Sequence, residues 1–298
     1  MRRRTLTLCL LGATCCLAQV PGQTSMQKMT ARLSEEADAF RRLAPNVLGR
    51  ESLHQRSLKP PPRFRPRVGD AARKPPEPTW QVREILSEYA FTKFMGEEET
   101  LHELRSVISV DGKPVKESKT AEDTLARIIT LKDTERQQQL LKEFEKYGLL
   151  GAATDFGQLL LLFTPRNMDR FEFTERGTKM IGEGEVLVFG YTQIDGPPSL
   201  TIFPSKPGEA PLKVRAAGEI WVREDNFLPM RITLAIRKLD GTREVREEAE
   251  VDYTTSTFGA LLPAMTHHRE LRGDAVVAEN TFVYSNFHQF GASSELKF

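Results

Sequence analysis

The sequence predicts an α+β fold, in which a strongly curved, unclosed antiparallel sheet (a half-barrel) is covered by about three amphipathic helices. Two observations support this prediction. From residue 155 onward, strand-like segments with alternating apolar and polar residues follow one another, joined by turn signals such as Asp240-Gly241 and Gly273-Asp274. Three earlier segments instead repeat apolar residues at three- and four-residue spacing. One-sided strands with short turns form an antiparallel meander, and the helices must cover its dry face.

The first residues have the pattern of a secretory signal. Arginines at 2–4 precede a short apolar stretch, and residues 16–18 form a small-x-small end. We therefore predict a signal peptide over 1–18, cleaved after about Ala18, with export to the periplasm or beyond the cell. The remaining 19–298 would form one half-barrel domain.

All three cysteines (Cys9, Cys15 and Cys16) lie inside this signal. The mature chain would therefore contain no disulfide, no thiolate nucleophile and no cysteine metal site. Neither Cys15 nor Cys16 has a good lipobox before it, so a lipid anchor at either one stays an open alternative.

The charge balance excludes one class of partner. The chain has 42 basic and 41 acidic side chains, a formal charge of +1. Such a balance gives no electrostatic reason to expect nucleic acid as a partner.

The helices are predicted from their apolar stripes and caps. The first stripe ends near Pro45 and consists of Met26, Met29, Leu33, Ala37, Phe40 and Leu43. In the middle of the chain, Thr120 is expected to cap a helix over 121–131 and Asp133 one over 134–147. Gly148 is expected to end the latter helix in a left-handed conformation.

A basic, proline-rich segment at 59–79 interrupts the early strands. Proline cannot join a sheet ladder, so this segment is predicted to be an extended loop. It has two interpretations, a solvated insertion between strands or a contact with anionic lipid headgroups or an acidic partner.

The run DFGQLLLLF at 155–163 is the most apolar part of the later chain. It is too short to cross a bilayer, which takes about 20 apolar residues. We predict a buried strand, with Leu160 and Leu162 facing one side and Leu159, Leu161 and Phe163 the other.

No catalytic or metal-binding motif stands out. The adjacent His267 and His268 would point to opposite faces of a strand, so they do not readily share a metal ion. Serines with a sharp glycine-flanked turn and phosphate-binding glycine loops are both missing from the sequence. We predict no enzyme, no cofactor and no metal, with a hydrolase as the third-ranked function because carboxylate pairs from distant strands leave no sequence signature.

The segment 218–253, GEIWVREDNFLPMRITLAIRKLDGTREVREEAEVDY, resembles the lipoprotein-carrier superfamily typified by LolA and by sensor domains of the RseB type. The likeness consists of a glycine-led strand with Trp221, a charged turn, a proline-arginine strand and a hairpin return. It implies an unclosed half-barrel with helices in its mouth, and an apolar cargo released when the helical lid shifts.

The resulting functional hypothesis is a non-enzymatic periplasmic carrier or sensor. It would bind an acyl chain, a lipid or a lipidated peptide or protein by burying hydrocarbon, which contributes about 0.8 kcal/mol per methylene. The expected lining is apolar and consists of Leu160, Leu162, Phe171, Phe173, Trp221, Ile232, Leu234, Ile236, Val251 and Tyr253.

Two alternatives stay open at this stage. Trp221 has the character of a half-buried strand residue that needs no ligand. The whole half-barrel could also be a filled scaffold, an envelope interaction module whose basic segment at 59–79 docks an envelope protein or an anionic membrane surface.

Overall fold

A computed structural model describes the chain over residues 24–59, 78–93, 101–149, 155–182, 184–202, 212–240 and 243–290. The predictions for the signal peptide at 1–18, for Cys15 and Cys16, and for most of the basic segment at 59–79 lie outside these ranges. Within the described residues, none of the helices combines the length and the apolar character needed to cross a membrane.

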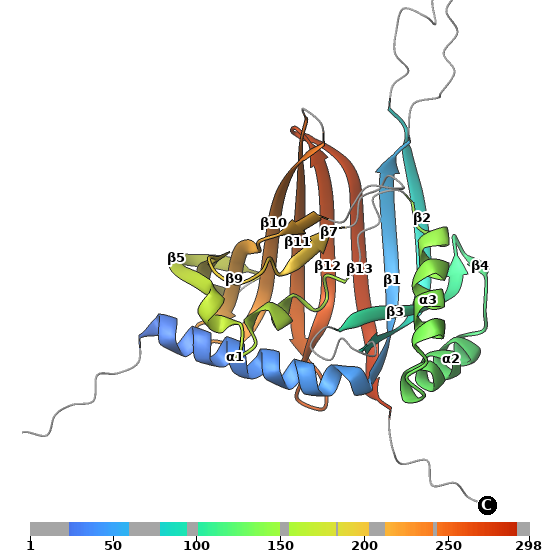
Figure 1. Cartoon of the computed structure of the whole chain (residues 1–298), viewed down its shortest axis with the longest axis horizontal. Coiled ribbons are helices and arrows are strands. Elements are labelled where there is room, and N and C mark those ends of the chain that lie inside the picture. Colours follow the sequence, from blue (N-terminus) through green and yellow to red (C-terminus); the bar gives the residue numbers. More distant parts are fainter. Residues whose placement is uncertain are drawn as a thin grey trace, which may run out of the picture.

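The predicted open antiparallel sheet is confirmed. Eleven of the strands form one sheet in the order β4-β3-β2-β1-β13-β12-β11-β10-β9-β6-β5, and β7 and β8 form a separate two-stranded ribbon. The strands are β1 Val47–Leu58, β2 Trp80–Thr92, β3 His102–Val110, β4 Lys113–Pro114, β5 Phe171–Ile181, β6 Gly184–Gln193, β7 Leu200–Ile202, β8 Leu212–Val214, β9 Ala217–Arg223, β10 Pro229–Asp240, β11 Arg243–Thr255, β12 Leu261–Arg272 and β13 Ala275–Gln289. In Figure 1, β3 runs across the direction of the central strands, so the sheet is strongly curved.

The sheet is a meander with one long-range junction. The hairpin between β12 and β13 turns at Gly273, whose φ of 62° is the left-handed conformation that glycine adopts easily. The hairpin between β10 and β11 pairs up to Asp240 and Arg243, while its expected turn residue Gly241 lies outside the described ranges. The junction is the antiparallel pair of β1 with β13, which joins the first strand of the chain to the last.

Three α-helices accompany the sheet, at two different places. The first, α1 (Ser25–Leu43), has a capping box at Thr24 and lies across the face of the sheet in Figure 1. The other two, α2 (Ser118–Thr130) and α3 (Thr134–Tyr147), pack on β2 and β3 at one end of the sheet.

Two predicted helix ends are wrong. Helix α2 begins three residues earlier than expected, with Glu117 instead of Thr120 at the N-cap position and no side-chain cap hydrogen bond. Gly148 has φ −69° and ψ 157°, so the chain leaves α3 in an extended direction instead of turning back through a left-handed residue. The cap at Asp133 is confirmed, since its carboxylate accepts from the backbone N–H of Arg136 at 3.1 Å.

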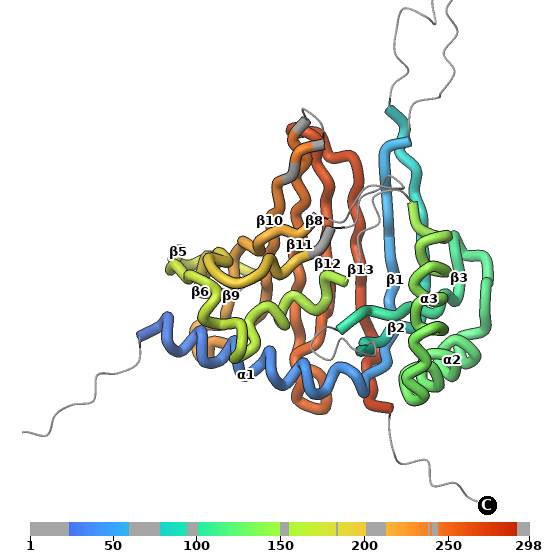
Figure 2. Tube along the Cα trace, in the orientation of Figure 1, coloured from blue at the N-terminus to red at the C-terminus, as the bar shows by residue number. Residues whose placement is uncertain are grey.

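The run at 155–163 is not a strand. Leu159–Phe163 form a 3₁₀ turn, η3, that lies between α1 and the sheet (Figure 2). Local hydrogen bonds take the place of a sheet ladder, from Leu159 N–H to the Phe156 carbonyl and from Leu161 N–H to the Gln158 carbonyl. Residues i and i+3 eclipse in a 3₁₀ helix, so Leu160 and Phe163 share one face and are both fully buried.

Gly218 on β9 lies close against the backbone of β10. A Cβ atom at this position would lie 2.0 Å from the carbonyl oxygen of Thr233 on β10, a backbone atom that cannot move aside alone. Only glycine fits there without displacing one strand.

We expect Gly218→Ala to lower the free energy of unfolding by about 1–3 kcal/mol, the usual cost of overpacking. Urea denaturation measures this loss. Gly184→Ala is the matched control, because its Cβ would meet only the Ile181 carbonyl oxygen at 3.7 Å. Equal stability of the two variants would contradict the close approach.

Candidate functional site: the covered concave face

The concave face of the sheet gathers most of the predicted lining residues. Seven of them are at most 6% exposed and belong to one apolar cluster, namely Leu160, Phe171, Ile232, Leu234, Ile236, Val251 and Tyr253. Leu162 and Phe173 are half-buried and pack against the same cluster. The structure therefore brings nine of the ten residues together, seven of them on the sheet and two, Leu160 and Leu162, on the η3 turn that packs against it.

Trp221 lies on the opposite face of the sheet. Its neighbours Ile220 and Val222 point into the core, so alternation turns Trp221 outward. Its indole N–H donates to Glu219 at 2.9 Å, and the Lys179 ammonium lies 4.5 Å from the ring centroid. Trp221 is thus a half-buried aromatic residue of the outer face with cationic neighbours. It is not part of the concave lining.

The concave face is covered by α1 and by η3. Helix α1 contributes the fully buried Met29, Leu33 and Phe40, as its predicted stripe requires. From η3, Phe163 packs edge-on against Tyr191 with ring centroids 5.0 Å apart, and its centroid is 5.1 Å from that of Phe171. We call α1 and residues 155–163 together the cover.

Tyr253 forms a polar tie between the cover and the sheet. Its hydroxyl accepts from the backbone N–H of Leu160 at 3.0 Å and donates to the Gly157 carbonyl oxygen at 3.2 Å. Burial raises the pKa of Tyr253, so the hydroxyl keeps the proton that it donates.

A buried ionic cluster lies beside this tie and was missed in the sequence. The guanidinium of Arg105 on β3 donates to both carboxylate oxygens of Glu51 on β1, at 2.7 and 2.8 Å, and to Glu103 at 2.7 Å. All three side chains are at most 2% exposed. The one available sequence signal was the spacing of Glu103 and Arg105, since residues two apart on a strand share a face.

The cluster holds more negative than positive charge. Asp155, at the start of the cover segment, brings a third carboxylate to 3.8 Å from Arg105. Burial, opposed by Arg105, raises the pKa of Glu103 to about 7, and it also raises that of Glu51. Burial raises the pKa of Asp155 to about 6, but a third of this side chain is exposed, so Glu103 is the group whose charge is least tolerated.

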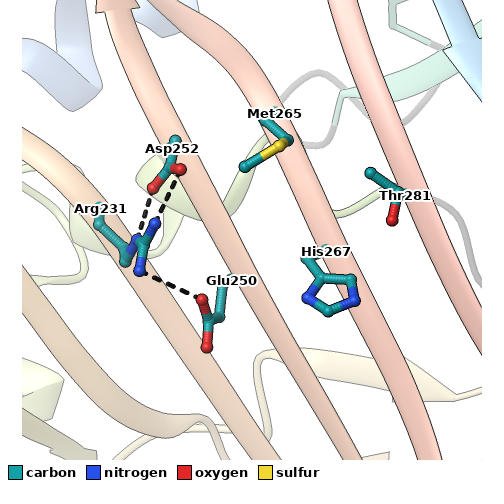
Figure 3. A pocket seen from close by; sticks show the side chains of 6 residues that line it. All are labelled: Arg231, Glu250, Asp252, Met265, His267 and Thr281. Carbon is teal, nitrogen blue, oxygen red and sulfur yellow. Dashed lines mark hydrogen bonds and ion pairs between the residues drawn. The ribbon is translucent and has the colours of Figure 1, made fainter. Parts of the chain in front are cut away.

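A pocket of about 230 Å³ lies on the outer face, over β10 to β13. Figure 3 shows its lining of Arg231, Glu250, Asp252, Met265, His267 and Thr281. Arg231 donates to Asp252 at 2.5 and 2.9 Å and lies 3.2 Å from Glu250, so these charges satisfy one another. Among the described residues, no three His, Cys, Asp or Glu side chains are placed to hold a metal ion.

Comparison with known proteins yields structures but no sequence relatives. No family model and no curated protein matches the chain. A LolA superfamily protein from Nitrosomonas europaea is 10% identical, covering 89% of this chain and 96% of its own, with a TM-score of 0.34. A DUF1329 family protein from Desulfovibrio piger is also 10% identical, covering 90% and 95%, with a TM-score of 0.37.

Removing the cation should expose the charge imbalance of the buried cluster. We expect Arg105→Met to cost about 3–5 kcal/mol, because it leaves buried carboxylates without a counter-charge. Without Arg105 the folded-state pKa values of Glu51 and Glu103 rise further, so the folded protein binds more protons than the unfolded one and its stability falls as pH rises. Urea denaturation should therefore show a larger loss at pH 8 than at pH 5.

The matched control is Arg56→Met. Arg56 pairs with Glu279 on the outer face and is about half exposed, so its loss should cost less than about 1 kcal/mol. A loss for Arg105→Met that is as small, or that does not change with pH, would contradict the account of the cluster.

Proposed function

We propose that this protein is an exported, non-enzymatic carrier or sensor that binds the acyl chain of a lipid or of a lipidated protein between the concave face and its cover. The single observation that supports this is the composition of the cover interface. Six predicted lining residues of the sheet share one apolar cluster with side chains of α1 and η3, and Tyr253 adds two hydrogen bonds to η3 and Gly157. Apolar contacts are non-directional, so hydrocarbon can take the place of the cover side chains.

The energetics favour a long acyl chain. Five large, fully buried side chains of the cover leave the sheet when it opens, namely Met29, Leu33, Phe40, Leu160 and Phe163. At about 2 kcal/mol for each buried side chain, their exposure costs about 10 kcal/mol. About fourteen methylenes, at about 0.8 kcal/mol each, offset this cost, and a short chain does not.

The alternative function is supported by the same burial. A concave face filled by its own cover is also what a rigid scaffold has, and in that case the basic segment at 59–79 docks an envelope protein or an anionic membrane surface. Deleting 60–77 separates the two functions. Loss of vesicle or partner binding in the deletion variant, together with no acyl binding by the intact protein, supports the scaffold, whereas acyl binding that survives the deletion supports the carrier.

The direct test is to weigh the protein with whatever it carries. The chain from Gln19 is exported to a bacterial periplasm and examined by native mass spectrometry before and after extraction with organic solvent. A lipid-sized mass that solvent removes supports the carrier. A bare polypeptide mass that does not change after incubation with lipid vesicles contradicts it.

Weakening the cover should favour binding of an acyl chain. In Leu33→Gln the fully buried Leu33 no longer holds α1 on the sheet, so the open state becomes more populated and the apparent affinity rises. We expect a dansyl-labelled fatty acid to bind at least about tenfold more tightly, since a change of 1.4 kcal/mol in the cover equilibrium is tenfold.

The control is Ala31→Gln, an exposed position on α1 that should leave the affinity unchanged. Specific binding is recognised by one probe per chain and by displacement with unlabelled fatty acid. If Leu33→Gln only loses stability and takes up no displaceable probe, the core is a filled scaffold.

A further inference from the structure

Residues 155–163, the part of the cover that we call the cover segment, begin against the buried ionic cluster. Asp155 lies 3.8 Å from the Arg105 guanidinium and 4.0 Å from the ring of His102. Phe156 stacks on His268 of β12, with ring centroids 4.9 Å apart. The contacts that hold this part of the cover are therefore ionic and aromatic, whereas α1 is held by the apolar side chains of Met29, Leu33 and Phe40.

Gly157 brings the backbone of the cover directly over Glu103. A Cβ atom on Gly157 would lie 3.0 Å from Glu103 Oε1 and 3.0 Å from the Tyr89 hydroxyl. This Glu103 oxygen is buried and faces the Tyr89 hydroxyl, while the other oxygen of the carboxylate is bound by Arg105. The closed cover thus shuts water away from one half of a carboxylate.

The backbone of the cover segment is strained at the same point. Asp155 has φ 69°, a left-handed conformation that is sparsely populated by residues other than glycine. Such a conformation persists where the surrounding contacts enforce it.

Glu103 is surrounded by acidic and phenolic groups with one guanidinium among them. The titratable and charged groups that face it, or that lie beside the cover segment above it, are Glu51 on β1, Tyr89 on β2, His102 and Arg105 on β3, Tyr253 on β11, His268 on β12, Tyr284 on β13 and Asp155 in the cover. If every carboxyl is ionised, three negative charges share one positive charge.

We propose that this cluster is a pH-sensitive latch: residues 155–163 stay closed on the concave face while Glu103 carries a proton, and they are released when Glu103 ionises. Release moves the Asp155 charge away from Glu103 and lets water reach the buried oxygen. The latch rests on the proposed function only for its role as a gate, since the closing of 155–163 is a property of the empty protein.

The direction follows from linkage. Burial holds the pKa of Glu103 at about 7 in the closed state, above its ordinary value of 4.5. The closed state therefore binds more protons than the open state between about pH 4.5 and 7, and its stability falls as pH rises through this window. The latch is closed in acid, loosens as pH rises towards neutral and is weakest above about pH 7.

Hydrogen exchange of the empty protein tests the latch. Protection factors of the amides in 155–163, corrected for the intrinsic pH dependence of exchange, are compared at pH 5.5 and pH 8. We expect protection to fall by at least about tenfold at pH 8, because one pKa unit corresponds to a tenfold change in the equilibrium. Amides of β10 and β11 serve as the reference for global opening and should change less.

Isosteric variants assign the effect. Glu103→Gln mimics the protonated side chain and should lose most of the pH dependence, while Glu279→Gln, an outer-face carboxylate paired with Arg56 and His267, should keep it. Asp155→Asn removes one repelling charge without touching the sheet and should also reduce the pH dependence, which keeps the test usable if Glu103→Gln does not fold. Gly157→Ala should lower protection at both pH values, because the added Cβ wedges the segment away from Glu103.

Either of two results overturns the latch: protection in 155–163 that is the same at both pH values in the unaltered protein, or the full pH dependence retained in both Glu103→Gln and Asp155→Asn. Fatty-acid binding is measured separately at each pH. A pH-dependent segment with no fatty-acid binding refutes the proposed function and leaves the latch standing, and pH-independent protection with fatty-acid binding does the reverse.

Discussion

The dry face of an open sheet has to be covered, and the arrangement of this protein follows from that constraint. Apart from the short β7–β8 ribbon, the curved sheet has no second sheet to bury its apolar face against, so other segments must supply the missing surface. Helix α1, which precedes β1, and residues 155–163, which precede β5, supply this surface. Their side chains complete one continuous apolar cluster with β10 and β11. The core of the protein is therefore the interface between the sheet and its cover.

Because the core is the interface between the sheet and its cover, the cover and the sheet can open separately. In a sandwich of two sheets, opening the core breaks the fold, whereas here the hydrogen-bond ladders that join β10, β11 and β12 do not involve the cover. The cover is therefore the part that can open with the sheet still intact. Its apolar contacts supply most of the free energy that holds the cover closed. The hydrogen bonds of Tyr253 fix the orientation of η3 on the sheet.

The ionic cluster fixes how β1, β3 and the start of the cover are positioned, more than it stabilises the fold. Buried ion pairs often contribute little net free energy, because desolvation offsets their attraction. Arg105 nevertheless joins β1, β3 and the start of the cover at one point, since a guanidinium offers several donors in fixed directions. On the outer face the same residue types form half-exposed pairs, such as Arg231 with Asp252, which water screens.

The amino-acid sequence by itself determined the class of fold, most strands of the meander and the face of those strand residues that alternate regularly. Alternation along a strand is local, so Ile232, Leu234 and Ile236 could be assigned to the buried face without knowledge of their partners. The stripe of α1 and the cap at Asp133 are local in the same sense.

Tertiary structure decided what lies opposite each face. The leucine run has no period of its own, and it became a 3₁₀ turn because it meets α1 and the concave face instead of another strand. Trp221 lies on the outer face because its strand neighbours fill the core. Glu51 and Asp155 meet Arg105 only after β1, β3 and the cover have come together, and contacts between residues so far apart in the chain leave no pattern in a single sequence.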